Sequence, residues 1–178
     1  MKMFCAAIAA ASVGFWLPGA ASAKPAGAID CAVEGLAAKQ RAELGTALLD
    51  DQRGDVATRA HDIIAKPAAA CAGRNRWTDA QAEIAINWSV WDLMGDEVQR
   101  RSGLSPADRA IMRLYVDEDP GRVAGLEHFT RAQIGQVMES LRQRGAHLRD
   151  AGEEADRQLS VLLMLREMNS EEAHFAGS

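Results

Sequence analysis

The stretch from Trp77 to Gly103 places the strongest constraint on how this 178-residue chain can fold. Thr78 can cap a helix here, and the side chain of Gln81 can reach back to the Thr78 backbone N–H, which is the capping-box pattern. Gly103 follows the last turn, where a left-handed residue is favoured. At about 100° per residue the apolar side chains form two opposite faces: Ala80, Ile84, Trp88, Trp91, Gly95 and Val98 on one, and Ala82, Ile86, Val90 and Leu93 on the other. Since a helix that is apolar on two faces is usually buried between neighbours, 78–102 is predicted to be a central helix.

The rest of the chain also has helical periodicity. Helices are predicted over about 30–50, 55–66, 105–116, 130–144 and 149–169, with a short helical turn within 122–129 and a frayed tail over 170–178. No segment alternates polar and β-branched apolar residues between turn signals, as strands do. We therefore expect an all-α fold, an antiparallel bundle of five to six helices around the central one.

Three of the predicted helices begin alike, with an apolar residue, a hydroxyl cap and a polar residue at the third helical position. The segments are Trp77-Thr78-Asp79-Ala80-Gln81, Leu104-Ser105-Pro106-Ala107-Asp108 and Phe129-Thr130-Arg131-Ala132-Gln133. Capping chemistry alone produces this likeness, so we interpret it as convergent; a true internal repeat is the alternative.

The N-terminus has the pattern of a secretory signal peptide. Lys2 precedes the apolar run 4–17, and Ala21-Ser22-Ala23 is a small-residue cleavage site. Cleavage after Ala23 would leave 24–178 as a single helical domain, in the periplasm or secreted; a buried N-terminal helix is the alternative. The net charge of −5 makes nucleic acid an unfavourable partner, and no later stretch predicts a membrane anchor.

The cysteines agree with export. Cys5 would be lost with the signal peptide, which leaves Cys31 and Cys71 as the only possible pair. Two helices joined by a short turn pack antiparallel, so Cys31 at the start of the first lies near Cys71, just past the end of the second. A structural disulfide that braces this N-terminal hairpin is predicted. A redox-active pair usually has closer spacing, such as C-x-x-C.

Known catalytic and cofactor motifs are missing from the sequence. None of the four histidines has another at i+3 or i+4, and Glu171 with His174 gives only one E-x-x-H pair. The doublet His61-Asp62 lacks the earlier histidine that metal-dependent phosphohydrolases need. The sequence predicts no cofactor or metal, and leaves the question of an enzyme open while favouring a non-catalytic role.

The central helix nevertheless carries candidates for a ligand pocket. These are Glu83, Asn87, Trp88, Trp91 and Asp92. The alternative is that the tryptophans fill the core and that the polar residues are solvated edges between the apolar faces.

The predicted C-terminal helix has more apolar surface than a peripheral helix needs. Its second seam contains Val161, Met164, Leu165 and Met168. We expect this seam to contact another protein or a second copy, unless the central helix covers it. The preferred functional hypothesis is a non-catalytic exported module that binds another protein or a client chain. The alternative is a small-molecule or metal binder with a pocket beside Trp88 and Trp91.

Overall fold

The computed structural model describes residues 29–50, 54–149 and 153–178, and all regular structure in these ranges is helical. The predicted signal peptide, 1–23, lies outside them. In chain order the elements are α1 (Cys31–Glu34), α2 (Ala38–Asp50), α3 (Gly54–Asn75), α4 (Asp79–Ser102), α5 (Pro106–Glu118), the 3-10 helices η1 (Pro120–Val123) and η2 (Leu126–His128), α6 (Arg131–Gln143) and α7 (Glu153–Gly177).

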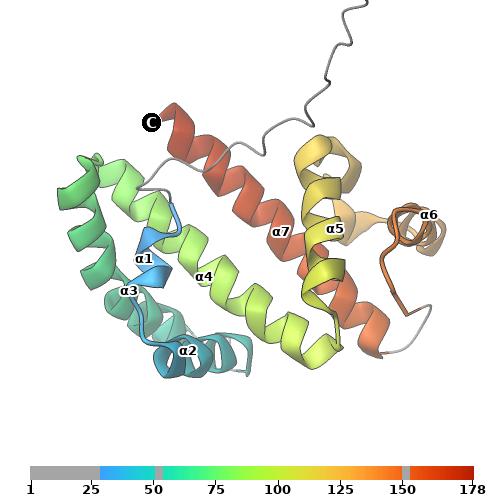
Figure 1. Cartoon of the computed structure of the whole chain (residues 1–178), viewed down its shortest axis with the longest axis horizontal. Helices are drawn as coiled ribbons and strands as arrows, with labels where there is room; N and C mark the ends of the chain where they lie inside the picture. The colour runs from blue at the N-terminus through green and yellow to red at the C-terminus, as the bar shows by residue number, and fades with distance from the viewer. Residues whose placement is uncertain (1–28, 51–53, 150–152) are drawn as a thin grey trace, which may run out of the picture.

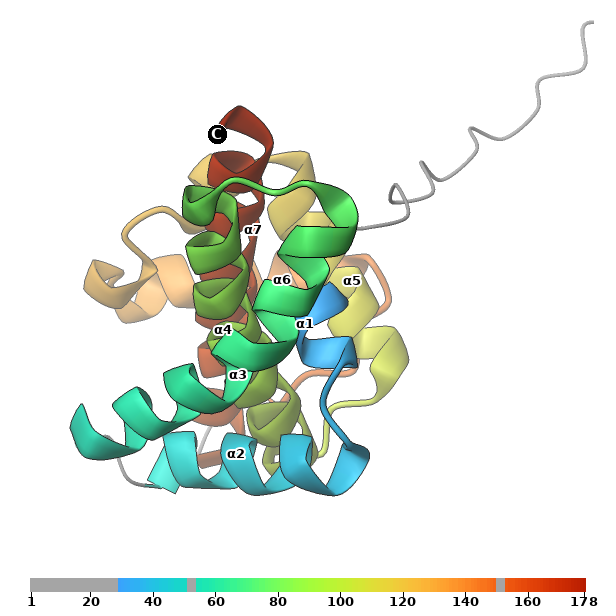
Figure 2. The same ribbon diagram turned by 90° about the vertical axis from the view of Figure 1, so that its left-hand side faces the viewer.

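Helix α4 is the predicted central helix. Thr78 Oγ1 accepts the backbone N–H of Gln81 at 3.1 Å, the Gln81 side chain accepts the Thr78 N–H at 3.0 Å, and Gly103 closes the helix with φ 68°. Helix α7 packs along one side of α4, while α1, α2 and α3 cover the other (Figures 1 and 2). Both apolar faces of α4 are therefore used.

Helices α4 and α7 form the most extensive helix pair, and they run antiparallel. Gln81 near the start of α4 donates to the carbonyl of Phe175 at 3.3 Å. Arg157 near the start of α7 donates to the carbonyl of Arg101 at 3.2 Å. These bonds lie at opposite ends of the pair, so each helix covers the other along most of its length.

This pairing corrects the expectation of an exposed interface on the C-terminal helix. The four predicted interface residues, Val161, Met164, Leu165 and Met168, are buried within the chain, as is the neighbouring Leu162. The structure has the alternative arrangement, in which the central helix α4 packs against α7 and its second seam is buried. The excess apolar surface of α7 is core because α4 is long enough to cover it.

The C-terminal tail also differs from its prediction, because 170–177 continue α7 instead of fraying. Phe175 packs edge-on against Trp77, with ring centroids 5.1 Å apart and planes at 86°. This contact, together with the hydrogen bond from Gln81, holds the last turn against the start of α4.

The first predicted helix is divided into α1 and α2, and the second continues past its predicted end. A Cβ on Gly35 would lie 2.7 Å from the Cβ of Pro67, so α1 lies very close to α3 at the division. Pro67 is inside α3, where proline costs about 3 kcal/mol or more. Burial on both sides of Pro67 offsets this cost, since the buried face of α3 runs on through Ile64, Ala68 and Cys71.

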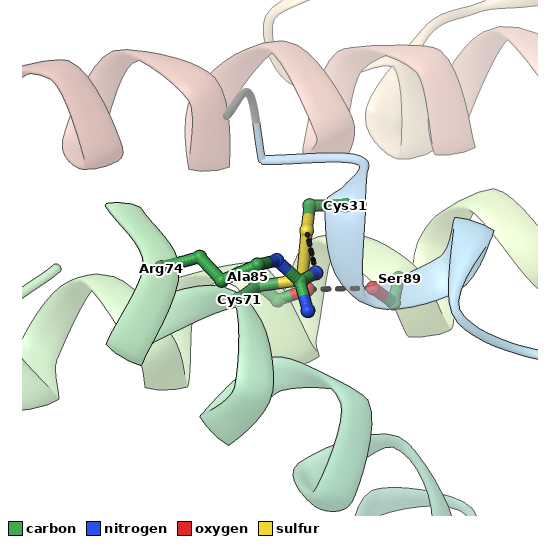
Figure 3. The surroundings of a disulfide bond; sticks show 5 residues. All are labelled: Cys31, Cys71, Arg74, Ala85 and Ser89. Atoms are coloured by element: carbon green, nitrogen blue, oxygen red, sulfur yellow. Dashed lines mark hydrogen bonds between the residues drawn. A yellow bond between two sulfur atoms is a disulfide. The ribbon is translucent and has the colours of Figure 1, made fainter. Parts of the chain in front are cut away.

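The predicted disulfide between Cys31 and Cys71 is present, with Cα atoms 6.1 Å apart. The disulfide joins α1 to α3 beside the small residues Ala85 and Ser89 of α4 (Figure 3). The hydroxyl of Ser89 donates to the carbonyl of Ala85 at 2.7 Å. One guanidinium nitrogen of Arg74 lies 3.2 and 3.3 Å from the two sulfurs. The described chain is thus all-helical and disulfide-braced.

Helix α2 packs mainly on α4 rather than along α3 as a simple hairpin would. A Cβ on Gly45 would lie 2.6 Å from the carbonyl oxygen of Leu93. The glycine that weakens the helix in isolation is therefore needed for this close crossing.

In the C-terminal half α5 and α6 begin where predicted, but the buried face of α5 differs from the one that helical spacing suggests. Capping boxes are present at Ser105 and at Thr130. The helical spacing of Ala107, Ala110, Ile111 and Leu114 would place these residues on one inner stripe of α5, yet Leu114 is 60% exposed. The buried residues of α5 are Asp108, Met112, Tyr115 and Val116. The carboxylate of Asp108 accepts the backbone N–H of His147 at 2.8 Å, which turns this face of α5 inward.

Candidate functional site

The five residues predicted to line a pocket do not lie together. Trp88 is 4% exposed, and its Nε1 donates to Oε1 of Glu172 at 3.0 Å. Asp92 faces α5, where Arg109 donates to its carboxylate at 3.2 Å. Trp88 therefore belongs to the core, and Asp92 belongs to an ion pair between α4 and α5.

Asn87 and Trp91 border a surface hollow of about 530 Å³ where α3, α4 and α7 meet. Its other lining residues are Ala57, Thr58 and His61 of α3, Val90 of α4 and Glu171 of α7. We call this feature the Trp91 hollow. It combines a large aromatic side chain with a few polar groups from three helices, which is the usual composition of a small-molecule site.

Glu83 stands beside the Trp91 hollow through its contact with His61. The Nε2 atom of His61 lies 3.1 Å from Oε1 of Glu83 and its Nδ1 lies 4.0 Å from Oδ1 of Asp62. The His61 side chain is therefore held between α3 and α4. All three side chains keep substantial contact with solvent.

Glu171 is the most unusual polar group in the hollow. Burial raises the pKa of its carboxyl above the ordinary value, with a further rise from Glu167, while His174 acts in the opposite direction. Within the described ranges no hydrogen bond or ion pair engages this carboxylate. It is a partly desolvated carboxylate whose charged neighbours, His174 and Glu167, act in opposite directions, and perturbed groups of this kind are enriched at binding and catalytic sites.

The sequence contains a signal for Glu171 that the predicted fraying of the tail concealed. Met164, Met168 and Phe175 continue one apolar seam of α7 at spacings of four and seven, and Glu171 occupies the seam position between the last two, three residues after Met168 and four before Phe175. A charged residue at an apolar position of a helix that is ordered to Gly177 indicates a special role. His61 belongs to a doublet that lacks the further histidine of a metal site, and no sequence pattern predicts that it lies near Trp91.

Other buried carboxylates have a different environment. Glu97 is 5% exposed and accepts hydrogen bonds of 2.7 Å from both Arg100 and Arg101. Arg101 also donates to Asp50 at 3.0 Å, which links α2 to α4. These hydrogen bonds, chiefly from Arg100, lower the pKa of Glu97 to about 2. Its charge is fully compensated, so its role is structural.

We expect Glu97 to make stability depend on pH in acid. Since its pKa is lower in the folded chain, its stabilisation is present above the ordinary value of 4.5 and is lost as pH falls towards about 2. Thermal unfolding between about pH 6 and about pH 2 should show a shallower fall in Tm for Glu97→Gln than for the wild type. Part of the fall should persist, because the pKa of Glu118 is also lowered to about 2 by Arg144 and Arg122.

Glu139→Gln is the matched control, since it removes the charge of an exposed glutamate on α6. Equal slopes for the wild type and Glu97→Gln would contradict the structural role of Glu97.

No group of three or more His, Cys, Asp and Glu side chains in the described part of the chain is placed to hold a metal ion. In the E-x-x-H pair, Glu171 lines the hollow whereas His174 is exposed. None of the helices in the described ranges has the length and apolar composition that a membrane span requires.

Comparison with protein-family models, curated proteins and solved structures gives no match for this chain. Function has to be inferred from the geometry of the molecule itself.

Proposed function

We propose that this chain is an exported binding protein that holds a small organic molecule in the Trp91 hollow. The observation that carries the proposal is the carboxyl of Glu171, partly buried and unengaged by other described residues, beside an indole in a hollow lined from three helices. A partly desolvated charge without a partner reduces stability, and such a cost is typically retained where a ligand compensates it.

The other hypothesis, a module that binds a protein or client chain, has less support. Binding of unfolded or partner chains usually needs a contiguous apolar patch. Among the described residues, the large apolar side chains that are exposed are Ile63, at 37%, and Leu114, at 60%, and they lie on different helices. The seam on which that hypothesis depended is buried against α4.

Export is supported by two independent features. The sequence 1–23 has the three parts of a signal peptide, and the disulfide between Cys31 and Cys71 is typical of an oxidising compartment. N-terminal sequencing of the protein recovered from the periplasm or medium should begin at Lys24.

Ligand-observed NMR with a library of small organic fragments tests the binding proposal. The processed, disulfide-bonded chain should bind at least one fragment that is lost in Trp91→Ala and kept in Leu114→Ala, a change of an exposed apolar residue on α5. Trp91 is only half-buried, so its replacement should leave the chain folded. If no fragment depends on Trp91, the proposal is wrong.

A further inference from the structure

We infer that the ligand of the Trp91 hollow is a small organic cation, a protonated amine attached to an apolar group. Its charged end would lie against the carboxylate of Glu171, and its apolar part against Trp91 and Val90. This inference rests on the proposed function and adds the chemical class of the ligand.

The charges around the hollow favour a cation. Its ionisable lining residues are Glu171 and His61, and Glu83 and Asp62 lie next to His61. No lysine or arginine is among the residues that line it in the described chain. An anionic ligand would add a further negative charge to a site with no arginine or lysine to balance it, which is unfavourable.

Glu171 specifies where the positive charge is placed. Its pKa is raised first by burial, so its ionised form lacks the solvation that water would provide. An ammonium group that binds here forms an ion pair at a partly desolvated position, where it is stronger than at the open surface. The bound cation would thus stabilise the ionised form of Glu171.

The rest of the lining suits the apolar part of such a ligand. Trp91 and Val90 project from adjacent positions of α4, and Ala57 adds apolar surface from α3. An indole also attracts a cation that lies over its ring. A volume of about 530 Å³ is within the range of small-molecule sites.

Two polar groups remain to orient the ligand. The Asn87 side chain is exposed and has no hydrogen bond to other described residues. The Thr58 hydroxyl donates to the carbonyl of Gly54 at 2.8 Å, so its lone pairs are left to accept from an ammonium. His61, in contrast, is already engaged with Glu83 and forms part of the wall.

The test uses three probes of similar shape and different charge: benzylamine, benzyl alcohol and benzoate. NMR titration of the processed, disulfide-bonded chain at neutral pH should show benzylamine binding about tenfold more tightly than benzyl alcohol, since a charge-assisted bond contributes about 1.5–3 kcal/mol. Benzoate should bind most weakly. Glu171→Gln should remove the preference for benzylamine, whereas Trp91→Ala should weaken both benzylamine and benzyl alcohol.

Glu139→Gln is the matched control, because it changes the net charge equally on the distant helix α6, and it should keep the preference. The inference is overturned if benzyl alcohol or benzoate binds as tightly as benzylamine, if benzylamine does not bind, or if its preference survives in Glu171→Gln. A neutral or anionic fragment that depends on Trp91 and binds at least as tightly as benzylamine would overturn the cation alone and leave the proposed function standing. Absence of any Trp91-dependent fragment would overturn both.

Discussion

Replacing Trp88 by alanine should lower the free energy of unfolding by about 3–5 kcal/mol, the usual loss for a buried aromatic side chain. Trp88 is 4% exposed in the α4–α7 contact, so its removal leaves a cavity that its neighbours can fill only in part. It also removes the Nε1 donor from Glu172, which keeps its contact with Arg113. Chemical denaturation monitored by circular dichroism measures the change.

Two further variants separate the contributions of Trp88. Trp88→Phe keeps most of the apolar volume and loses the hydrogen bond, so a smaller loss of about 1–2 kcal/mol is expected. Trp91→Ala should also cost clearly less than Trp88→Ala, because Trp91 is only partly buried beside the hollow. Equal losses for the two alanine variants would show that Trp88 does not have the central packing role assigned to it.

Removal of the disulfide should have an effect of similar size. The double variant Cys31→Ser/Cys71→Ser opens a loop with a sequence separation of 40 residues, for which the chain-entropy model gives about 4 kcal/mol. We expect a markedly lower Tm, with α1 released from α3 as the first structural consequence. Thermal unfolding and hydrogen exchange of residues 29–36 provide the two measurements.

The wild type in the presence of a reductant is the appropriate control, and it should match the double variant. The intact mass of the oxidised protein should be lower by the mass of the two hydrogens that disulfide formation removes. An unchanged Tm in the double variant would mean that packing alone holds α1, and the bracing role would then be wrong.

Much of the Trp91 hollow could not be predicted from the sequence. Of the five residues of α4 that were predicted to line a pocket, Asn87 and Trp91 line this hollow. Trp88, at i−3 from Trp91 and on the same calculated stripe, is nevertheless core. Periodicity shows that two residues share a helix face, but it does not show which part of that face a neighbouring helix covers.

Local sequence signals were sufficient to predict where three of the helices begin. The capping boxes at Thr78, Ser105 and Thr130 involve residues only three positions apart, so their chemistry is complete within one turn and tertiary contacts do not alter it. The pairing of Cys31 with Cys71 could also be predicted from the sequence, because they are the two cysteines outside the predicted signal peptide and can form only one intramolecular bond.

Tertiary packing decided the features that depend on distant segments. Pro67 does not end α3, because burial of the residues around it outweighs the local cost of proline. The tail does not fray, because Phe175 packs against Trp77, which lies far earlier in the chain, and this packing outweighs the weak tendency of the last turns to form helix on their own. The apolar seam of α7 is buried because α7 packs along α4, another contact between segments that are distant in the sequence. Local propensities contribute a few tenths to about one kcal/mol per residue, whereas burial of one large side chain contributes several times more, so the contacts between helices determine where each helix ends and which face it buries.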